Sequence, residues 1–349
     1  MLAIWMVFLP GIVINNIALF LDHFLFHRFK KVRIKKPIFI IGNARSGTTF
    51  FHRLLCKDQN RYAYFKTYEV FFPSLLFRKI ILGLIHCLEC LFKGKLTHWM
   101  NKKETKIFSD VNHIHKVSIN QAEEEEALFF FAFWSVDLHF LFPFLSKMED
   151  MNQFETLKES DKNQLLSYYE NCLKRHMTVH GEKKIFLSKN PNSTSKLWEM
   201  SNHFPDSRFI LLVRNPLEQI PSTLNLFGTV WESISGPMPC DSPEFKRLYN
   251  INVDMYKYML RALPRIDKKR IAIVLYDDLV KDPEKIIKEV YHHFDMDISD
   301  DFKAVLSAEK KRHSTYKSTH EYSLEKYNLT PEKIYNDLED VFTTFGFSI

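Results

Sequence analysis

Residues 38 to 49 read Ile38-Phe39-Ile40-Ile41-Gly42-Asn43-Ala44-Arg45-Ser46-Gly47-Thr48-Thr49, and the fold prediction starts from them. Four consecutive apolar residues predict a strand that is buried on both faces, as in a parallel sheet. A loop bounded by two glycines follows, and residues 49–55 then place apolar side chains at helical spacing. Because the first N–H groups of a helix are unpaired, a strand, loop and helix in this order predict a site for a phosphate.

The position of the cation distinguishes this loop from the common nucleotide-binding loop. The spacing Gly42-x4-Gly47 matches the phosphate loop of nucleoside-triphosphate-binding proteins, but Thr48 stands where that motif has lysine. The positive charge lies inside the loop instead, at Arg45. A guanidinium can bind two oxygens of one phosphate, whereas an ammonium acts as a point charge. A glycine turn without any ligand is the alternative.

Three further apolar runs predict strands, and helical sequence separates them: residues 184–188, 208–213 and 270–276. This alternation predicts a P-loop-like, three-layer α/β/α fold with a parallel central sheet. Residues 69–180 form an insertion between the first two predicted strands, and we expect it to be helical and to build the acceptor pocket above the strand ends. We expect its helices over 69–100, 122–142 and 162–180.

Bulk properties narrow the classes of function. The chain has 349 residues and a formal net charge of +6, which suits an enzyme that binds a small polyanion. The sequence has no long basic stripe with interleaved aromatic residues, so we do not expect it to bind nucleic acid. Five irregularly spaced cysteines argue against a secreted disulfide framework. We expect one domain over residues 37–349.

Residues 1–36 form a different kind of segment. No charged side chain occurs in residues 1–21, and a basic run follows over residues 28–36. Because Pro10-Gly11 interrupts the apolar stretch, we expect a broken helix that lies in or dips into the membrane. A spanning helix and a helix packed on the protein's own surface are the alternatives. The expected location is cytoplasmic, with peripheral or monotopic attachment to the membrane.

A second strand-to-helix junction carries another candidate anion site. Residues 209–216 read Phe-Ile-Leu-Leu-Val-Arg-Asn-Pro, and Ser222 follows Arg214 by eight positions. An arginine that leaves a strand and a serine about two turns into the next helix can both reach one anion. Two anion sites at two strand ends are a stronger signal than either site alone.

These motifs resemble those of the sulfotransferase superfamily, which uses 3'-phosphoadenosine 5'-phosphosulfate as donor. The resemblance implies that five loop residues bind the 5'-phosphate: Arg45, Ser46, Gly47, Thr48 and Thr49. It also implies that Arg214 and Ser222 bind the 3'-phosphate. Residues 36–349 look most like a large, mainly bacterial sulfotransferase family with membrane-associated members, although Tyr327-Asn328 replaces the Phe-Gly pair common there. The donor is then the co-substrate, a hydroxyl is the acceptor, and no metal is required.

The candidates for catalysis come from the same resemblance. Glu69 lies about twenty residues after the loop, where related enzymes carry a base, and its apolar neighbours are expected to raise its pKa. His115 is the competing base, and Glu124, one of four consecutive glutamates at 123–126, would orient the acceptor. Lys189, at a strand end, would neutralise the charge on the departing phosphate.

Two other functions stay open from the sequence alone. A P-loop kinase or nucleoside-triphosphatase would use Asp277, after the run 271–276, to hold magnesium. A catalytically silent membrane-surface protein of the same fold would explain the apolar N-terminus. The acceptor is not specified by any motif, but the 32 phenylalanines favour a lipid or another bulky alcohol over a free sugar.

Overall fold

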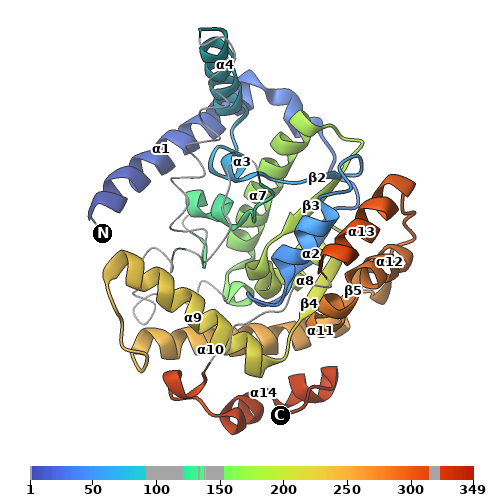
Figure 1. Ribbon diagram of the computed structural model, residues 1–349. Coiled ribbons are helices and arrows are strands. Elements are labelled where there is room, and N and C mark those ends of the chain that lie inside the picture. Colours follow the sequence, from blue (N-terminus) through green and yellow to red (C-terminus); the bar gives the residue numbers. More distant parts are fainter. Residues whose placement is uncertain (1, 92–120, 133, 137, 139–152, 314–322) are drawn as a thin grey trace.

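The computed structural model describes residues 2–91, 121–132, 134–136, 138, 153–313 and 323–349. The core is a parallel sheet in the order β2-β3-β1-β4-β5, with helices on both faces (Figure 1). Its strands are β1 Ile38–Ile41, β2 Tyr62–Ala63, β3 Ile185–Lys189, β4 Arg208–Val213 and β5 Ile271–Leu275. The predicted fold class is therefore confirmed. The sequence did not reveal β2, because two residues are too few to show a period.

Alternating residues of the strands pack into separate apolar layers. Phe39 and Ile41 join a cluster with helices α7 to α10 and α14, whereas Ile38 and Ile40 pack with α2, α12 and α13. These helices are α2 Thr48–Leu55, α7 Glu159–His180, α8 Leu197–His203, α9 Pro216–Ser235, α10 Pro243–Ala262, α12 Pro283–His293, α13 Asp300–His313 and α14 Pro331–Phe345. Since both faces of the sheet are covered, its strands are apolar throughout.

The insertion differs from the prediction in two ways. It lies between β2 and β3, where the structure describes α3 Thr67–Phe71, α4 Leu75–Leu91 and α7. The helix expected over 122–142 is wrong in its first part, because residues 122–125 are not helical and only a 3-10 helix, η2 Glu126–Ala132, follows. Glu125 and Glu126 of this segment instead accept hydrogen bonds from Ser188 of β3 and from Asn190 just after it. Residues 92–120 and 139–152 lie outside the described residues.

The N-terminal segment forms one helix, α1 Leu2–Leu25, which continues through Pro10. The expected break at Pro10-Gly11 is therefore wrong: a proline removes one helical hydrogen bond, and the flanking turns continue the helix on either side. Within the part of the chain that the structure describes, no helix combines the length and the apolar character needed to cross a membrane.

A buried carboxylate attaches α1 to the body of the protein. Asp22 is fully buried, and its two oxygens accept hydrogen bonds from the backbone N–H groups of Leu75 and Leu76, which begin α4. Arg175 of α7 donates to the same carboxylate over 2.8 Å. An acidic side chain at a helix N-terminus compensates its unpaired N–H groups. Asp22 thus connects α1, α4 and α7.

Candidate functional site

The loop after β1 has a backbone that requires its glycines. A Cβ added to Gly42 would lie 2.1 Å from the carbonyl oxygen of Leu212 in β4, and the φ of Gly42 is +136°. Gly47 has a φ of +87° and caps the N-terminus of α2. Arg45, between them, also has a positive φ, of 69°. Strained backbone at a non-glycine residue is typical of functional loops.

Helices on the far side of the loop hold it in this shape. The carbonyl oxygen of Ala44 accepts hydrogen bonds from Gln219 over 2.8 Å and from Thr223 over 3.2 Å. Gln219 is buried and also donates to Asn252 of α10. The N–H of Gly42 donates to Thr194 over 2.8 Å. These hydrogen bonds to the Ala44 carbonyl and from the Gly42 N–H hold the loop in one shape. Its remaining backbone groups can then face a ligand.

The structure brings the two predicted anion sites together. Arg45 Nε donates to Ser222 Oγ over 3.0 Å, and Arg214 Nη1 donates to the carbonyl oxygen of Arg45 over 3.2 Å. Arg214 also stacks on the ring of Tyr276, 4.2 Å away, and pairs with the exposed Glu218. Residues far apart in the sequence, in the loop after β1 and on β4–α9, are therefore in direct contact.

Lys189 and Glu124 stand at the end of β3. Lys189 is paired in register with Ile40 of β1, which ends at the loop. Its side chain is only 1% exposed, and its Nζ lies 2.7 Å from a carboxylate oxygen of Glu124. Burial alone would lower the pKa of Lys189, but the carboxylates of Glu124, Glu123 and Glu125 outweigh it, so the pKa is raised above its ordinary value. Lys189 is therefore a cation held at the strand end.

The next two glutamates have a role that the sequence did not indicate. Glu125 accepts hydrogen bonds from Tyr169 over 2.9 Å and from Ser188 of β3, and burial raises its pKa despite these bonds. Glu126 accepts from Asn190 over 2.8 Å. The sequence predicts a helix over this segment and gives no partner for either carboxylate. The backbone conformation decides which of the four adjacent glutamates are buried. The sequence alone could not identify them.

Glu69 lies in a buried network of its own. It is 1% exposed, and Arg78 and His180 contact one oxygen, at 3.3 Å and 2.7 Å. The backbone N–H of Lys66 donates to the other oxygen. The expected rise in the pKa of Glu69 is wrong: burial favours a rise, but the hydrogen bond from His180 and the charge of Arg78 outweigh it and lower the pKa.

This network also has the composition of a metal site. Ligand atoms of Glu69, His176 and His180 lie within 4.8 Å of one another. Two histidines and a carboxylate suit zinc. However, Arg78 contacts both Glu69 and His176, at 3.3 Å and 3.4 Å. Since a guanidinium already supplies the positive charge there, we assign the cluster as a buried ion pair. His115, the competing base, lies outside the described residues.

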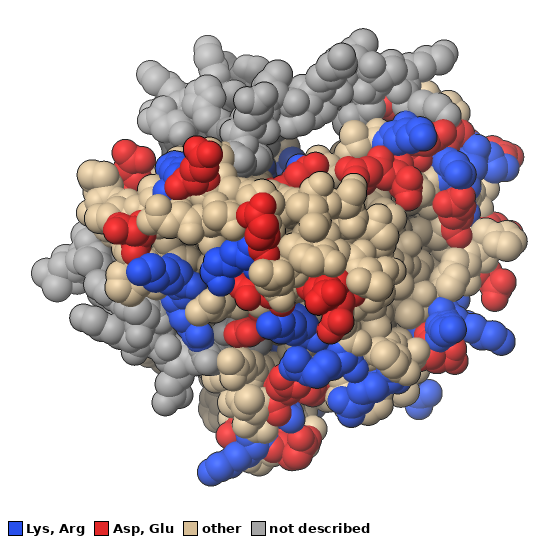
Figure 2. Space-filling model, turned by 90° about the horizontal axis from the view of Figure 1, so that it is seen from below, with Lys and Arg blue, Asp and Glu red and all other residues tan. Residues whose placement is uncertain are grey.

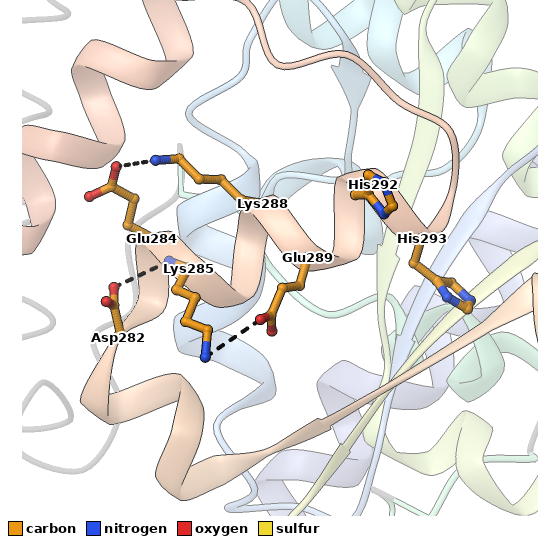
Figure 3. Close-up of a pocket in the computed structure, with 7 residues that line it drawn as sticks. All are labelled: Asp282, Glu284, Lys285, Lys288, Glu289, His292 and His293. Atoms are coloured by element: carbon orange, nitrogen blue, oxygen red, sulfur yellow. Dashed lines mark hydrogen bonds and ion pairs between the residues drawn. The ribbon is translucent and has the colours of Figure 1, made fainter.

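Other surface features have little bearing on the donor. A depression of about 620 Å³ on α12 is lined by charged residues that pair with one another, Lys288 with Glu284 and Lys285 with Glu289 (Figure 3). Three of its lining residues are acidic and two are lysines, a poor balance for an anion. On the face shown in Figure 2, basic and acidic side chains are interspersed.

Comparisons with known proteins identify the family of this chain. The sequence model described as "Sulfotransferase family" matches residues 37–300. Omega-hydroxy-beta-dihydromenaquinone-9 sulfotransferase Stf3 of Mycobacterium bovis is 23% identical over 300 residues, which cover 85% of this chain and 71% of the relative, and the Mycobacterium tuberculosis protein of that name matches equally.

Two solved structures share the fold. Sulfotransferase STF1 from Mycobacterium tuberculosis superposes with a TM-score of 0.70 at 20% identity, and the match covers 95% of this chain and 84% of that one. Sulfotransferase STF9 from Mycobacterium avium gives a TM-score of 0.74 at 16% identity, covering 95% and 82%. Because the family model matches residues 37–300, the alternatives of a kinase and of a catalytically silent protein are set aside. On its matched residues and its fold, this chain is an enzyme of the sulfotransferase family.

Proposed function

We propose that the enzyme transfers a sulfuryl group from 3'-phosphoadenosine 5'-phosphosulfate to a hydroxyl of a lipid-like acceptor. The observation that carries the proposal is the contact of Arg45 with both Ser222 and Arg214. Two cationic strand ends that adjoin in this way suit a ligand with two separate phosphates. A nucleoside triphosphate, whose phosphates form one chain, would leave the second site without a ligand.

The donor's two ends would bind at different helices. Residues 45–49 would hold the 5'-phosphosulfate, since the free N–H groups at the start of α2 attract anions. Arg214 and Ser222 would hold the 3'-phosphate. To bind it, Arg214 must exchange its pair with Glu218, whose side chain is 54% exposed. An exposed pair of this kind is weak, so the exchange costs little.

Lys189 and Glu124 would perform the transfer. The acceptor oxygen attacks sulfur, the bond between sulfur and the bridging oxygen breaks, and its electron pair stays on the 5'-phosphate. Lys189 would neutralise that charge, which requires it to turn from Glu124 toward the phosphate. Glu124, released from its ion pair, would accept the acceptor's proton. The products are a sulfate ester and adenosine 3',5'-bisphosphate.

Glu124 is the better placed of the two described carboxylates for the role of base. Its side chain is 31% exposed and lies at the strand end, beside Lys189. Glu69 is buried, and its lowered pKa makes it a weaker proton acceptor. We therefore propose Glu124 as the base and a structural role for Glu69, with His115 as the remaining candidate from the sequence.

The acceptor and the membrane complete the proposal. The matched relatives named Stf3 carry a hydroxylated menaquinone in their name, and a lipid-like alcohol is proposed for this enzyme as well. Residues 1–36 would keep the enzyme at the membrane where such an acceptor is dissolved. In support, Asn16 of α1 donates to the carbonyl oxygen of Phe131 in η2, so α1 adjoins the segment that carries Glu124.

Incubation with sulfur-labelled donor and a total lipid extract tests the reaction. Mass spectrometry should find a lipid with one added sulfate, and equimolar adenosine 3',5'-bisphosphate should form. No labelled lipid from a preparation that binds the bisphosphate would contradict the acceptor class. Label on a free sugar or a protein would contradict it too.

A further inference from the structure

We propose that α1 and α4 together form a docking surface for anionic phospholipid, with a headgroup seat at their junction. The inference deepens the proposed membrane contact of residues 1–36 by adding α4 and one defined pocket. Figure 1 shows both helices at the edge of the molecule, with α4 projecting away from the sheet.

The first observation is an exposed apolar stripe on α1. Large side chains recur at helical spacing on the face turned away from the body and are more than a third exposed: Val13, Ile14, Ile17, Phe20, Leu21, Phe24 and Leu25. Phe20 and Phe24 reach 63% and 67% exposure. The opposite face, with Asn15, Ala18 and Asp22, is buried against the protein. An apolar stripe of this size that is exposed to solvent indicates a binding face.

The second observation is a matching stripe on α4. Ile80, Leu84 and Leu88 follow one another at intervals of four residues and are exposed, Leu84 by 58%. Leu82 is exposed as well, on the opposite side of the helix, because two residues turn an α-helix by about 200°. Asp22, in the last turn of α1, accepts hydrogen bonds from the start of α4, so the two helices meet at a fixed place. The apolar face is therefore built from two helices that the fold holds together.

The third observation is a pocket where the helices meet. It has a volume of about 430 Å³ and an apolar lining that includes Leu25, Phe26 and Leu82. Arg28 and Lys79 also line it, as does Arg78, whose charge is paired with Glu69, and none of the described residues in the lining is a carboxylate. Lys79 Nζ lies 4.4 Å from the centre of the Phe26 ring. An apolar pocket with only cationic charge fits a phosphate with an attached hydrocarbon chain.

The positive charge around the pocket favours the surface of an anionic bilayer as the binding partner. Arg28 belongs to η1 His27–Lys31, where the side chains of Lys30 and Lys31 are also exposed and add to the positive charge near the pocket. Each basic residue near an anionic membrane contributes about 1 kcal/mol, and buried apolar side chains add to this. A second copy of this chain would present the same positive rim and would be repelled.

Binding of the full chain to liposomes tests the proposal. Vesicles of phosphatidylglycerol and phosphatidylcholine should bind the protein, and pure phosphatidylcholine vesicles should bind it roughly tenfold less tightly or worse. Arg28→Ala/Lys79→Ala should remove most of this preference for anionic lipid. Lys285→Ala/Lys288→Ala, which removes the same charge from α12, is the matched control and should bind as the wild type does.

A probe on α4 separates docking through both helices from docking through α1 alone. Cys87 is exposed on the same face as Leu84 and Leu88, and the other described exposed cysteine, Cys90, can be replaced by serine. An environment-sensitive fluorophore on Cys87 should shift to shorter wavelength on anionic vesicles. Leu82→Ser/Leu84→Ser should weaken vesicle binding, whereas binding of adenosine 3',5'-bisphosphate should stay unchanged.

Three results would overturn the proposal: equal binding to neutral and anionic vesicles, an unshifted probe on protein that floats with vesicles, or dimerisation that buries the probe in the absence of lipid. If the wild type does not bind adenosine 3',5'-bisphosphate, the proposed function is contradicted. The vesicle result would stand independently of that outcome.

Discussion

At the scale of single residues, the proposed transfer depends on which carboxylate receives the acceptor's proton. The resemblance to sulfotransferases indicated Glu69, Glu124 and Lys189 as candidates for catalysis. The structure adds the ion pair of Lys189 with Glu124 and the enclosure of Glu69 by Arg78 and His180. The side-chain partners could not be read from the sequence, because Arg78 and His180 come from helices that meet only in the fold.

We expect Glu124→Gln to lower the rate of transfer by about 100-fold or more, which is the range for loss of a general base. Binding of adenosine 3',5'-bisphosphate should persist, since that ligand bears no acceptor. Stopped assays with labelled donor and calorimetric binding check both parts. Turnover close to that of the wild type would move the base to Glu69 or His115.

Glu69→Gln should act on stability instead. Breaking a buried ion pair costs about 3 kcal/mol of unfolding free energy, because the partner, here Arg78, is left unpaired. The folded-state pKa of Glu69 is lowered, so its contribution is present above the unfolded pKa and disappears as the pH falls through the folded value. Denaturant titrations should therefore show a gap between variant and wild type at neutral pH that closes in acid. A constant gap would contradict the ion-pair role.

At the scale of elements, the sequence predicted what local patterns encode. Four of the five strands, the phosphate loop and the helix after it were expected and are present. The helix expected over 122–142 was wrong in its first part, because long-range hydrogen bonds of Glu125 to Ser188 of β3, and of Glu126 to Asn190 just after it, override local propensity. The continuity of α1 was missed for another reason: a proline inside a helix removes one hydrogen bond without having to end the helix.

The loop after β1 provides a test of close packing. Gly42→Ala should cost several kcal/mol, about 3 or more, because the new Cβ meets both an unfavourable φ and the Leu212 carbonyl. Gly181→Ala is the matched control, since its φ is also positive, at +93°, but no atom lies within 4 Å of the new Cβ. Equal losses of stability in the two variants would show that the close approach to β4 is relaxed in solution.

The attachment of α1 makes a second prediction at this scale. Asp22→Asn should remove the charge that pairs with Arg175 and weaken the cap of α4, at a cost of about 3 kcal/mol. Proteolysis should then cleave near residues 25–36 faster than in the wild type. Unchanged stability and cleavage would show that the packing of the buried face of α1 is enough to hold the helix.

At the scale of the whole molecule, the fold brings three strand ends together. The ends of β1, β3 and β4 bring Arg45, Lys189 and Arg214 to one edge of the sheet, as parallel strands do. The order of motifs along the chain sufficed to predict this edge. The acceptor side was not predictable, because the insertion carries no motif and part of it lies outside the described residues.

The most direct test compares two nucleotides in calorimetric titrations, adenosine 5'-phosphate and adenosine 3',5'-bisphosphate. Arg45→Ala should weaken the binding of both. Arg214→Ala should reduce the affinity for the bisphosphate by about 100-fold, to the level of the monophosphate, and should leave the monophosphate unaffected, since charged hydrogen bonds contribute about 1.5–3 kcal/mol each. If Arg214→Ala weakens both nucleotides equally, or if the wild type does not distinguish them, the two strand ends do not hold opposite ends of one donor.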